Sequence, residues 1–237
     1  MRVFAAKKEE HMRSFIKRIM KGDDIAVNRQ IHLIFVVLLF LGYVLFTRLA
    51  RVTSFYWAYF WQFLFDAIIL LLYISYLNSD FEIRIAKPEK NFVRTVVLAL
   101  LYAALFAAAS NVFYSFFFRV DVAFQWSPDI TFSYLAVYLI VNVAIAFSEE
   151  ALFRFYLYEW INARIKHAAI STILIAILFA LIHRFFKNVP FVVYIGFGFF
   201  SLYESVLRRR HKDSFYLCSL VHLFYNCILN FVVTVSF

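Results

Sequence analysis

Two adjacent carboxylates, Glu149 and Glu150, lie in a long apolar run, and Arg154 follows Glu150 by four residues. On a helix, Glu150 and Arg154 share a face and can pair, whereas Glu149 is rotated by about 100°. Because an ionised side chain inside a bilayer costs at least about 2.5 kcal/mol, the group predicts a functional site. Alternatively, the helix leaves the membrane early, but Phe153 and Phe155 continue the apolar pattern and argue against this.

Two histidines and an amide stand in later apolar runs. His183 follows Phe179 by four residues and Asn226 follows His222 by four, so each pair shares a helix face. A single histidine in such a run is also typical of a packed or interfacial residue. A single asparagine is also typical of a hydrogen bond between membrane helices.

The depth of these residues along their helices predicts that they meet. If the segments on either side of residue 166 form a helical hairpin, Glu149 and His183 are each 17 residues from the turn and lie at the same height. His222 follows the loop near residue 211 and is expected about 16 Å above that loop. Glu149 and His183 are expected about 25 Å above the turn near residue 166. The mismatch is small enough for three helices to share one pocket.

Such a set of side chains suits the hydrolysis of a peptide bond. A carboxylate in apolar surroundings can take a proton from water, and a histidine can orient that water. A second histidine and an amide can stabilise the oxyanion that forms when water attacks a carbonyl. A glutamate and two histidines could instead bind zinc and activate a metal-bound water, and the residue types do not choose between the two routes.

These residues need helices to position them. Hydrophobic residues make up 64% of the 237-residue chain and charged residues 16%, whereas a soluble domain is about half apolar and a quarter charged. The apolar runs are continuous and do not alternate, which argues against strands. We therefore predict an all-α, polytopic membrane bundle. Its seven expected transmembrane segments are 31–47, 55–77, 92–118, 133–157, 168–186, 190–207 and 214–236.

The ends of the chain differ in character. Residues 1–30 form a basic arm in which apolar residues recur at helical spacing between lysines and arginines. This pattern predicts an amphipathic helix on the membrane surface, and the alternative is a solvated tail. Residues 31–237 are then expected to form a single transmembrane domain.

The basic residues predict the orientation. With the N-terminus inside, 18 of the 24 Lys and Arg lie in inner segments and five in outer loops, so the N-terminus is expected to be cytoplasmic. Basic residues that flank membrane segments are attracted to anionic lipid headgroups. The net charge of +9 therefore predicts the lipid bilayer as a partner and no nucleic acid.

Other polar residues in the apolar runs are weaker candidates. Asp66, Asn142 and Glu204 could line the site or reach an interface. Cys218 and Cys227 lie in one apolar segment and are predicted to be small buried side chains, neither a disulfide nor a metal pair.

The motifs, taken in order, resemble those of the CPBP intramembrane proteases. This family includes the eukaryotic CAAX prenyl endopeptidase and the bacterial Abi, or bacteriocin-processing, proteins. The matching motifs are Glu149-Glu150-x-x-x-Arg154, Phe179-x-x-x-His183 and His222-x-x-x-Asn226. The resemblance covers about residues 140–235 and implies that Glu150 and Arg154 support the site.

The resemblance also implies the catalytic roles. Glu149 would be the base that activates water, His183 would share that water, and His222 and Asn226 would form the oxyanion hole. The family has been described as metal-dependent and as metal-free; a divalent metal such as zinc, if present, would be held by Glu149, His183 and His222. Many bacterial members have Gly after the motif Arg, where this chain has Phe155.

The expected function is an intramembrane endopeptidase that cuts a peptide or membrane-protein substrate in a bacterial cytoplasmic membrane. One alternative is a non-proteolytic scaffold or bacteriocin self-immunity protein of the same fold, which need not retain both glutamates and both histidines. Another alternative is an ion-coupled transporter. Transporters often show internal repeats and helices broken by Gly or Pro, and the motif segments show neither.

Overall fold

The computed structural model describes residue 42 and residues 60–68, 70–71, 91–119, 121–124, 131–186, 190–211, 214–231 and 233–236. Residues 60–68 and 70–71 are helical. The elements that follow are α4 (Phe92–Phe118), β1 (Asp121–Phe124), α5 (Phe132–Glu150), the π-helix η1 (Ala151–Leu157), α6 (Tyr158–Ile165), α7 (Ala168–Phe186), α8 (Phe191–Arg210), α9 (Phe215–Phe231) and β2 (Val233–Ser236). The predicted arm at 1–30 lies outside the described residues, as does the first predicted segment except residue 42.

Helices dominate the described part of the chain, as the sequence predicts. Three of them are long and apolar enough to cross a membrane: Phe92–Phe118, Phe132–Ile165 and Phe191–Arg210. The apolar segments Ala168–Arg184 and Phe215–Phe231 are shorter. The protein is therefore a helical membrane protein, while the count of seven segments and the extent of a single domain stay predictions.

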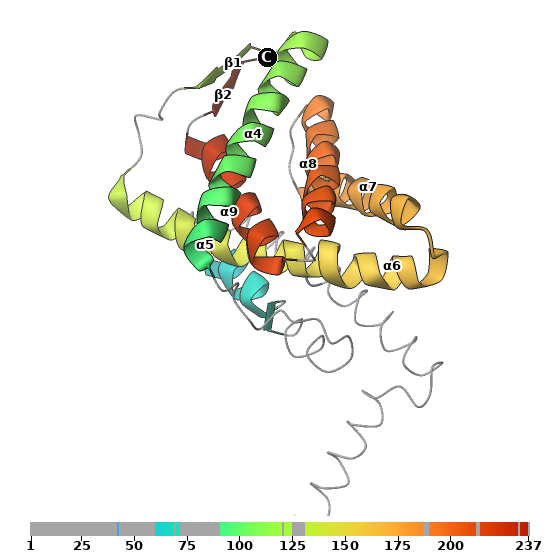
Figure 1. Ribbon diagram of the computed structural model, residues 1–237. Coiled ribbons are helices and arrows are strands. Elements are labelled where there is room, and N and C mark those ends of the chain that lie inside the picture. The colour runs from blue at the N-terminus through green and yellow to red at the C-terminus, as the bar shows by residue number, and fades with distance from the viewer. Residues whose placement is uncertain are drawn as a thin grey trace, which may run out of the picture.

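One pair of short strands joins distant parts of the chain. β1 and β2 are antiparallel, with Asp121 opposite Ser236 and Phe124 opposite Val233 (Figure 1). The predicted last segment therefore ends as a helix at Phe231, five residues early. β-branched residues favour strands, and three of the four residues of β2, Val233, Thr234 and Val235, are of this type.

The elements α5, η1 and α6 form one continuous helix of 34 residues, which runs across the direction of α4 and α8 (Figure 1). Thr131 caps its start, since the hydroxyl accepts a hydrogen bond from the backbone N–H of Tyr134 at 3.2 Å. The helix continues eight residues beyond the predicted end at residue 157, because neither Gly nor Pro interrupts it. It stops at Lys166, which adopts the left-handed conformation with φ 55°.

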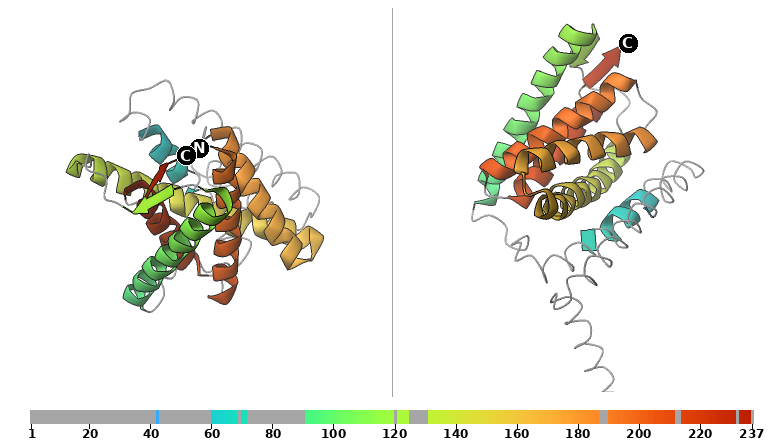
Figure 2. Two further views of the ribbon diagram at one scale, coloured as in Figure 1. Left: turned by 90° about the horizontal axis from the view of Figure 1, so that it is seen from above. Right: turned by 90° about the vertical axis from the view of Figure 1, so that its right-hand side faces the viewer.

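Small residues allow α4 to approach its neighbours. Its buried positions are Thr95, Ala99, Ala103 and Ala107, four residues apart on one face, and α9 is its main neighbour. Small side chains let membrane helices pack closely. α7 packs chiefly against α8 (Figure 2), so α8 and α9 bring α4 and α7 together around the long helix.

Substitution of a glycine in α8 would test the close contact between α8 and α4. A Cβ atom at Gly196 would lie 1.6 Å from the hydroxyl of Tyr114, whereas a Cβ at Gly198 would meet its nearest atom, Cβ of Ala180, at 3.8 Å. We expect Gly196→Ala to lower the free energy of unfolding by about 1–3 kcal/mol, because overpacking forces neighbours to move. Gly198→Ala is the matched control and should unfold like the wild type in a thermal melt in detergent. Equal melting of the two variants would contradict the close approach.

Candidate active site

Glu150 is held at the centre of a buried charged group. Its Oε1 atom lies 3.3 Å from Nη1 of Arg154 and 2.8 Å from Nδ1 of His222. Glu150 is completely buried, and Arg154 is only 1% exposed. The pairing predicted from the four-residue spacing is therefore present, and the reading in which these side chains leave the membrane for water does not fit their burial.

Glu149 faces two histidines from other helices. Its Oε2 atom lies 3.9 Å from Nε2 of His183 on α7 and 3.7 Å from Nε2 of His222 on α9. All three residues are less than 9% exposed. Residues that are 34 and 73 positions from Glu149 in the sequence thus meet at one carboxylate.

The backbone of α7 fixes the hydrogen positions on His183. The Nδ1 atom of His183 lies 2.8 Å from the backbone carbonyl of Phe179, one turn earlier. A carbonyl can only accept a hydrogen bond, so Nδ1 carries the hydrogen and donates it. In a neutral ring the Nε2 atom, which faces Glu149, is then an acceptor.

Aromatic rings enclose the charged groups. The guanidinium of Arg154 lies 4.2 Å from the centre of the Phe179 ring, within the range of a cation–π contact. The ring of His183 lies 4.4 Å from that of Phe197, and the ring of His222 lies 5.0 Å from that of Phe200. These rings hold the imidazoles in place and exclude lipid and bulk water from the carboxylates.

The local helix type at the motif differs from an α-helix. Residues Ala151–Leu157 form a π-helix that starts directly after Glu150 and contains Arg154. Single turns of π-helix inside α-helices are frequent at functional sites. The wider turn shows that the motif is built into a specialised stretch of backbone.

Asn226 lies on α9 one turn beyond His222, and its side-chain amide contacts another amide. Its Nδ2 atom donates to Oδ1 of Asn142 at 3.3 Å, while Nδ2 of Asn142 donates to the backbone carbonyl of Tyr138. Asn142, a weaker candidate in the sequence, therefore orients Asn226. The Nδ2 atom of Asn226 carries a second hydrogen, and its predicted role as an oxyanion donor stays a prediction.

Asp66 extends the polar group toward the N-terminal half. It is 1% exposed, and its Oδ1 atom accepts a hydrogen bond from the hydroxyl of Ser148 at 2.9 Å. Its Oδ2 atom accepts from Nε2 of Gln62 at 2.6 Å. Because Ser148 precedes Glu149 in the chain, Asp66 supports the backbone that carries the two glutamates.

Sequence reasoning missed the parts played by Phe179 and Ser148. The signal for Phe179 was its place in the second motif, but its carbonyl and ring functions depend on folded geometry. Ser148 directly precedes the two glutamates, and its bond to Asp66 joins residues 82 positions apart. A pairing over that distance leaves no periodic trace in the sequence.

Two sets of residues could hold a metal. Within the described part of the chain, one group of three possible ligands has all its donor atoms within 4.8 Å of one another: Glu150, Glu204 and Cys218. The set predicted from the sequence, Glu149 with the two histidines, is a different one, although its two glutamate–histidine separations are below 4 Å.

An apolar groove lies between α7 and α8, and its lining includes none of the predicted catalytic residues. It has a volume of about 490 Å³, and its lining includes Ala176, Ala180, Arg184 and Tyr194. Arg184 directly follows His183 in α7, and its guanidinium lies 5.3 Å from the centre of the Tyr194 ring. The groove is thus apolar along its walls and cationic near the histidine.

Comparison with known families found one match. Residues 131–228 match the family described as "Type II CAAX prenyl endopeptidase Rce1-like". The match extends from the cap of α5 almost to the end of α9 and includes Glu149, His183 and His222. No curated protein and no solved structure matches the chain. Residues 131–228, less than half of the chain, are therefore similar to the Rce1-like CAAX proteases, and they lie in a helical membrane protein.

Proposed function

We propose that this protein is an intramembrane endopeptidase in which Glu149 activates a water molecule that attacks a peptide bond. The observation that carries the proposal is the separation of Oε2 of Glu149 from the Nε2 atoms of His183 and His222, 3.9 and 3.7 Å. These distances are too long for direct hydrogen bonds and suit one water that bridges the three groups. A glutamate and two histidines around one water form the core of a hydrolytic site.

The hydrogen-bond partners of the histidines assign their tasks. His183 donates through Nδ1 to a carbonyl, so its Nε2 atom can accept a hydrogen from the water and orient it. His222 faces Glu150 through Nδ1, and its Nε2 atom donates only when the ring carries both hydrogens. Glu149 and Glu150 face its two nitrogens and offset the charge of that form, which suits a donor to an oxyanion.

The reaction then follows from these positions. Glu149 takes a proton from the water while the water oxygen forms a bond to the carbonyl carbon of the substrate. The negative charge that develops on the carbonyl oxygen is stabilised by Nε2–H of His222 and Nδ2–H of Asn226. The carbon–nitrogen bond breaks as Glu149 passes its proton to the leaving amine, so one water is consumed and two peptide ends are released.

A zinc-dependent route is the second candidate for the same site. Histidines that bind a metal usually donate their other ring hydrogen to a carbonyl or carboxylate, and the Nδ1 atoms of His183 and His222 face such groups. Glu149 and the two Nε2 atoms would hold the ion, which would supply Lewis-acid activation of water. We favour the metal-free route, since the donor atoms that all lie within 4.8 Å of one another belong to another group.

The test of the proposal is direct. The purified protein is incubated with a library of membrane-spanning peptides, with and without a metal chelator, and the products are identified by mass spectrometry. Cleavage that persists in the chelator supports the metal-free route, and cleavage that stops shows dependence on a bound metal, which the zinc content of a Glu149→Gln variant then assigns to the catalytic centre or to another site. Absence of any cleavage, together with unchanged partner binding or ion uptake in a Glu149 variant, would favour a scaffold or transporter.

The oxyanion role of Asn226 gives a quantitative prediction. Asn226→Ala is expected to reduce kcat by about 10²- to 10³-fold, because loss of one oxyanion donor costs about 2.7–4 kcal/mol in the transition state. Asn230→Ala, one turn further along α9, is the matched control, since Asn230 bonds to Tyr134 and is exposed. Steady-state kinetics on one cleaved peptide check both. Equal kcat values for the two variants would remove Asn226 from the oxyanion hole.

We also propose that the N-terminus faces the cytoplasm of a bacterial cell. The excess of lysines and arginines in the segments that would then be internal supports this orientation. The apolar groove between α7 and α8 supports a substrate that approaches along the membrane, since its walls offer apolar side chains to a membrane segment.

A further inference from the structure

Glu204 is a buried carboxylate that the proposed reaction does not use. It lies on α8 and is completely buried. Neither of its carboxylate oxygens has a hydrogen-bond partner among the described residues, and the same holds for Oε2 of Glu150. A buried ionised oxygen without a partner costs several kcal/mol. These oxygens therefore call for a cation or for protons.

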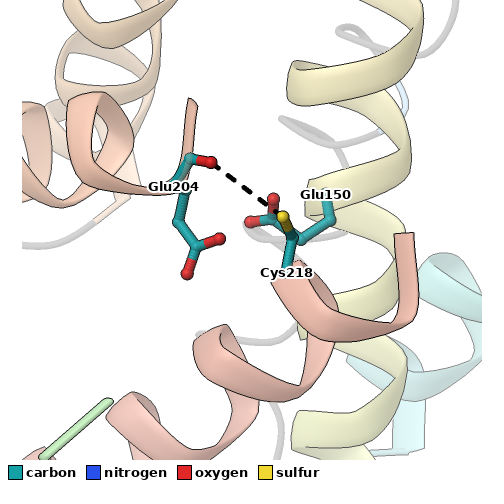
Figure 3. A group of neighbouring side chains, drawn as sticks. All are labelled: Glu150, Glu204 and Cys218. Carbon is teal, nitrogen blue, oxygen red and sulfur yellow. Dashed lines mark hydrogen bonds between the residues drawn. The ribbon is translucent and has the colours of Figure 1, made fainter. Parts of the chain in front are cut away.

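A thiol completes the group. Cys218 of α9 is completely buried, and its Sγ atom lies 3.9 Å from the backbone carbonyl of Glu204. The possible ligand atoms of Glu150, Glu204 and Cys218 all lie within 4.8 Å of one another. Figure 3 shows these side chains converging from three helices, the long helix, α8 and α9.

We propose that Glu150, Glu204 and Cys218 bind a zinc ion that is distinct from the proposed catalytic centre. Zinc accepts thiolate and carboxylate ligands at about 2.0–2.3 Å in a tetrahedral arrangement, and a thiolate favours it over magnesium or calcium. The three ligand atoms already lie within 4.8 Å of one another. Only small movements are therefore needed to bring them to three corners of such a tetrahedron.

The charges of the group support a divalent ion. Two carboxylates and a thiolate carry three negative charges, and Arg154, which pairs with Glu150, offsets one of them. A Zn²⁺ ion offsets the remaining two, so the buried group becomes neutral. Neutrality is the condition under which such a group can remain inside a membrane bundle.

The site would act on the proposed catalytic centre through Glu150. Its Oε1 atom contacts Nδ1 of His222, while Oε2 is the oxygen available to the metal. An ion on Oε2 would fix the plane of the carboxylate and hence the direction in which Nε2 of His222 points. With three protein ligands the zinc would keep a fourth position for water, and it would tie α8 and α9 to the long helix.

Metal analysis of the whole purified protein in detergent tests the proposal. We expect about one zinc ion per chain by mass spectrometry of the metal. Glu204→Gln and Cys218→Ser should lose at least about tenfold of that zinc. Glu159→Gln and Cys227→Ser are the matched controls, since they change a carboxylate and a cysteine outside the group, and both should retain it.

A second set of variants separates this site from the catalytic one. Glu149→Gln and His183→Ala should keep the zinc, because neither residue belongs to the group. Zinc lost from these two variants but kept in Glu204→Gln would overturn the proposal and place the metal at the proposed catalytic centre. The metal analysis does not depend on cleavage. It therefore decides the zinc proposal even if the proposed protease function fails.

Cobalt provides a measurement that needs no variant to fold. Protein loaded with Co²⁺ alone should show a thiolate-to-cobalt charge-transfer band in the near ultraviolet, since Cys218 would be a ligand. Cys227→Ser should keep this band. Wild-type protein with neither bound zinc nor the cobalt band would overturn the proposal and leave Glu150 and Glu204 as a pair that shares a proton.

Discussion

Glu149→Gln is expected to lower the rate of peptide cleavage by about 10²- to 10⁴-fold, the usual contribution of a general base. The amide has nearly the same size as the carboxylate but cannot take a proton from water. Its oxygen keeps a contact with the two histidines, whose Nε2 atoms lie 3.9 and 3.7 Å from the native carboxylate. The change therefore removes the chemistry and leaves the packing.

The matched control is Glu159→Gln, which makes the same change ten residues further along the chain. Glu159 pairs with Arg208 away from the histidines and should retain cleavage within a few-fold. Turnover of one peptide and thermal melts of both variants are measured side by side. A Glu149→Gln variant that cleaves at the wild-type rate would exclude Glu149 as the base.

Arg154→Met is expected to lower the free energy of unfolding by about 3–5 kcal/mol, because it removes the guanidinium that is paired with the buried carboxylate of Glu150. Both side chains are at most 1% exposed, so water cannot replace the lost partner. Methionine fills most of the volume and keeps a contact with the Phe179 ring. The loss is measured from unfolding curves in detergent, with labelling of the buried Cys218 thiol as the signal.

A double variant distinguishes the charge from the shape of the side chain. Arg154→Met combined with Glu150→Gln removes both charges, so it should be more stable than Arg154→Met alone. If the double variant is less stable by the sum of the two single losses, the ion pair at 3.3 Å contributes little and packing of the arginine accounts for the effect.

Local spacing predicted much of the arrangement. The four-residue separation of Glu150 and Arg154 gave their pairing, and the run at 92–118 coincides with α4. Both follow from the geometry of a single helix, in which the spacing of residues in the sequence determines their relative positions. The turn near residue 166 was likewise signalled, and the chain reverses at Lys166 in the left-handed conformation.

The relative positions of residues on different helices were harder to predict from the sequence. Counting the rise per residue placed His222 about 9 Å below Glu149, yet Nε2 of His222 lies 3.7 Å from its carboxylate. The count assumes parallel axes, whereas the long helix runs across α4 and α8 (Figure 1). Height along one helix then does not measure height along another.

Long-range polar contacts also escaped prediction. Asp66 and Glu204 stood in the sequence as isolated charges, and only folding shows Asp66 bonded to Ser148 and Glu204 beside Cys218. The pairing of β1 with β2 joins segments more than 100 residues apart. Such contacts depend on the whole bundle and have no local pattern.

The π-helix at Ala151–Leu157 makes this stretch sensitive to chain length. Each residue of an α-helix turns the chain by about 100°, so removal of one residue here would swing α6 and everything after it out of alignment with the two glutamates. Side-chain exchanges in this stretch keep the registration, whereas a single-residue insertion or deletion breaks it. Relatives with a functional site should therefore keep the number of residues in this stretch and the arginine that pairs with the second glutamate.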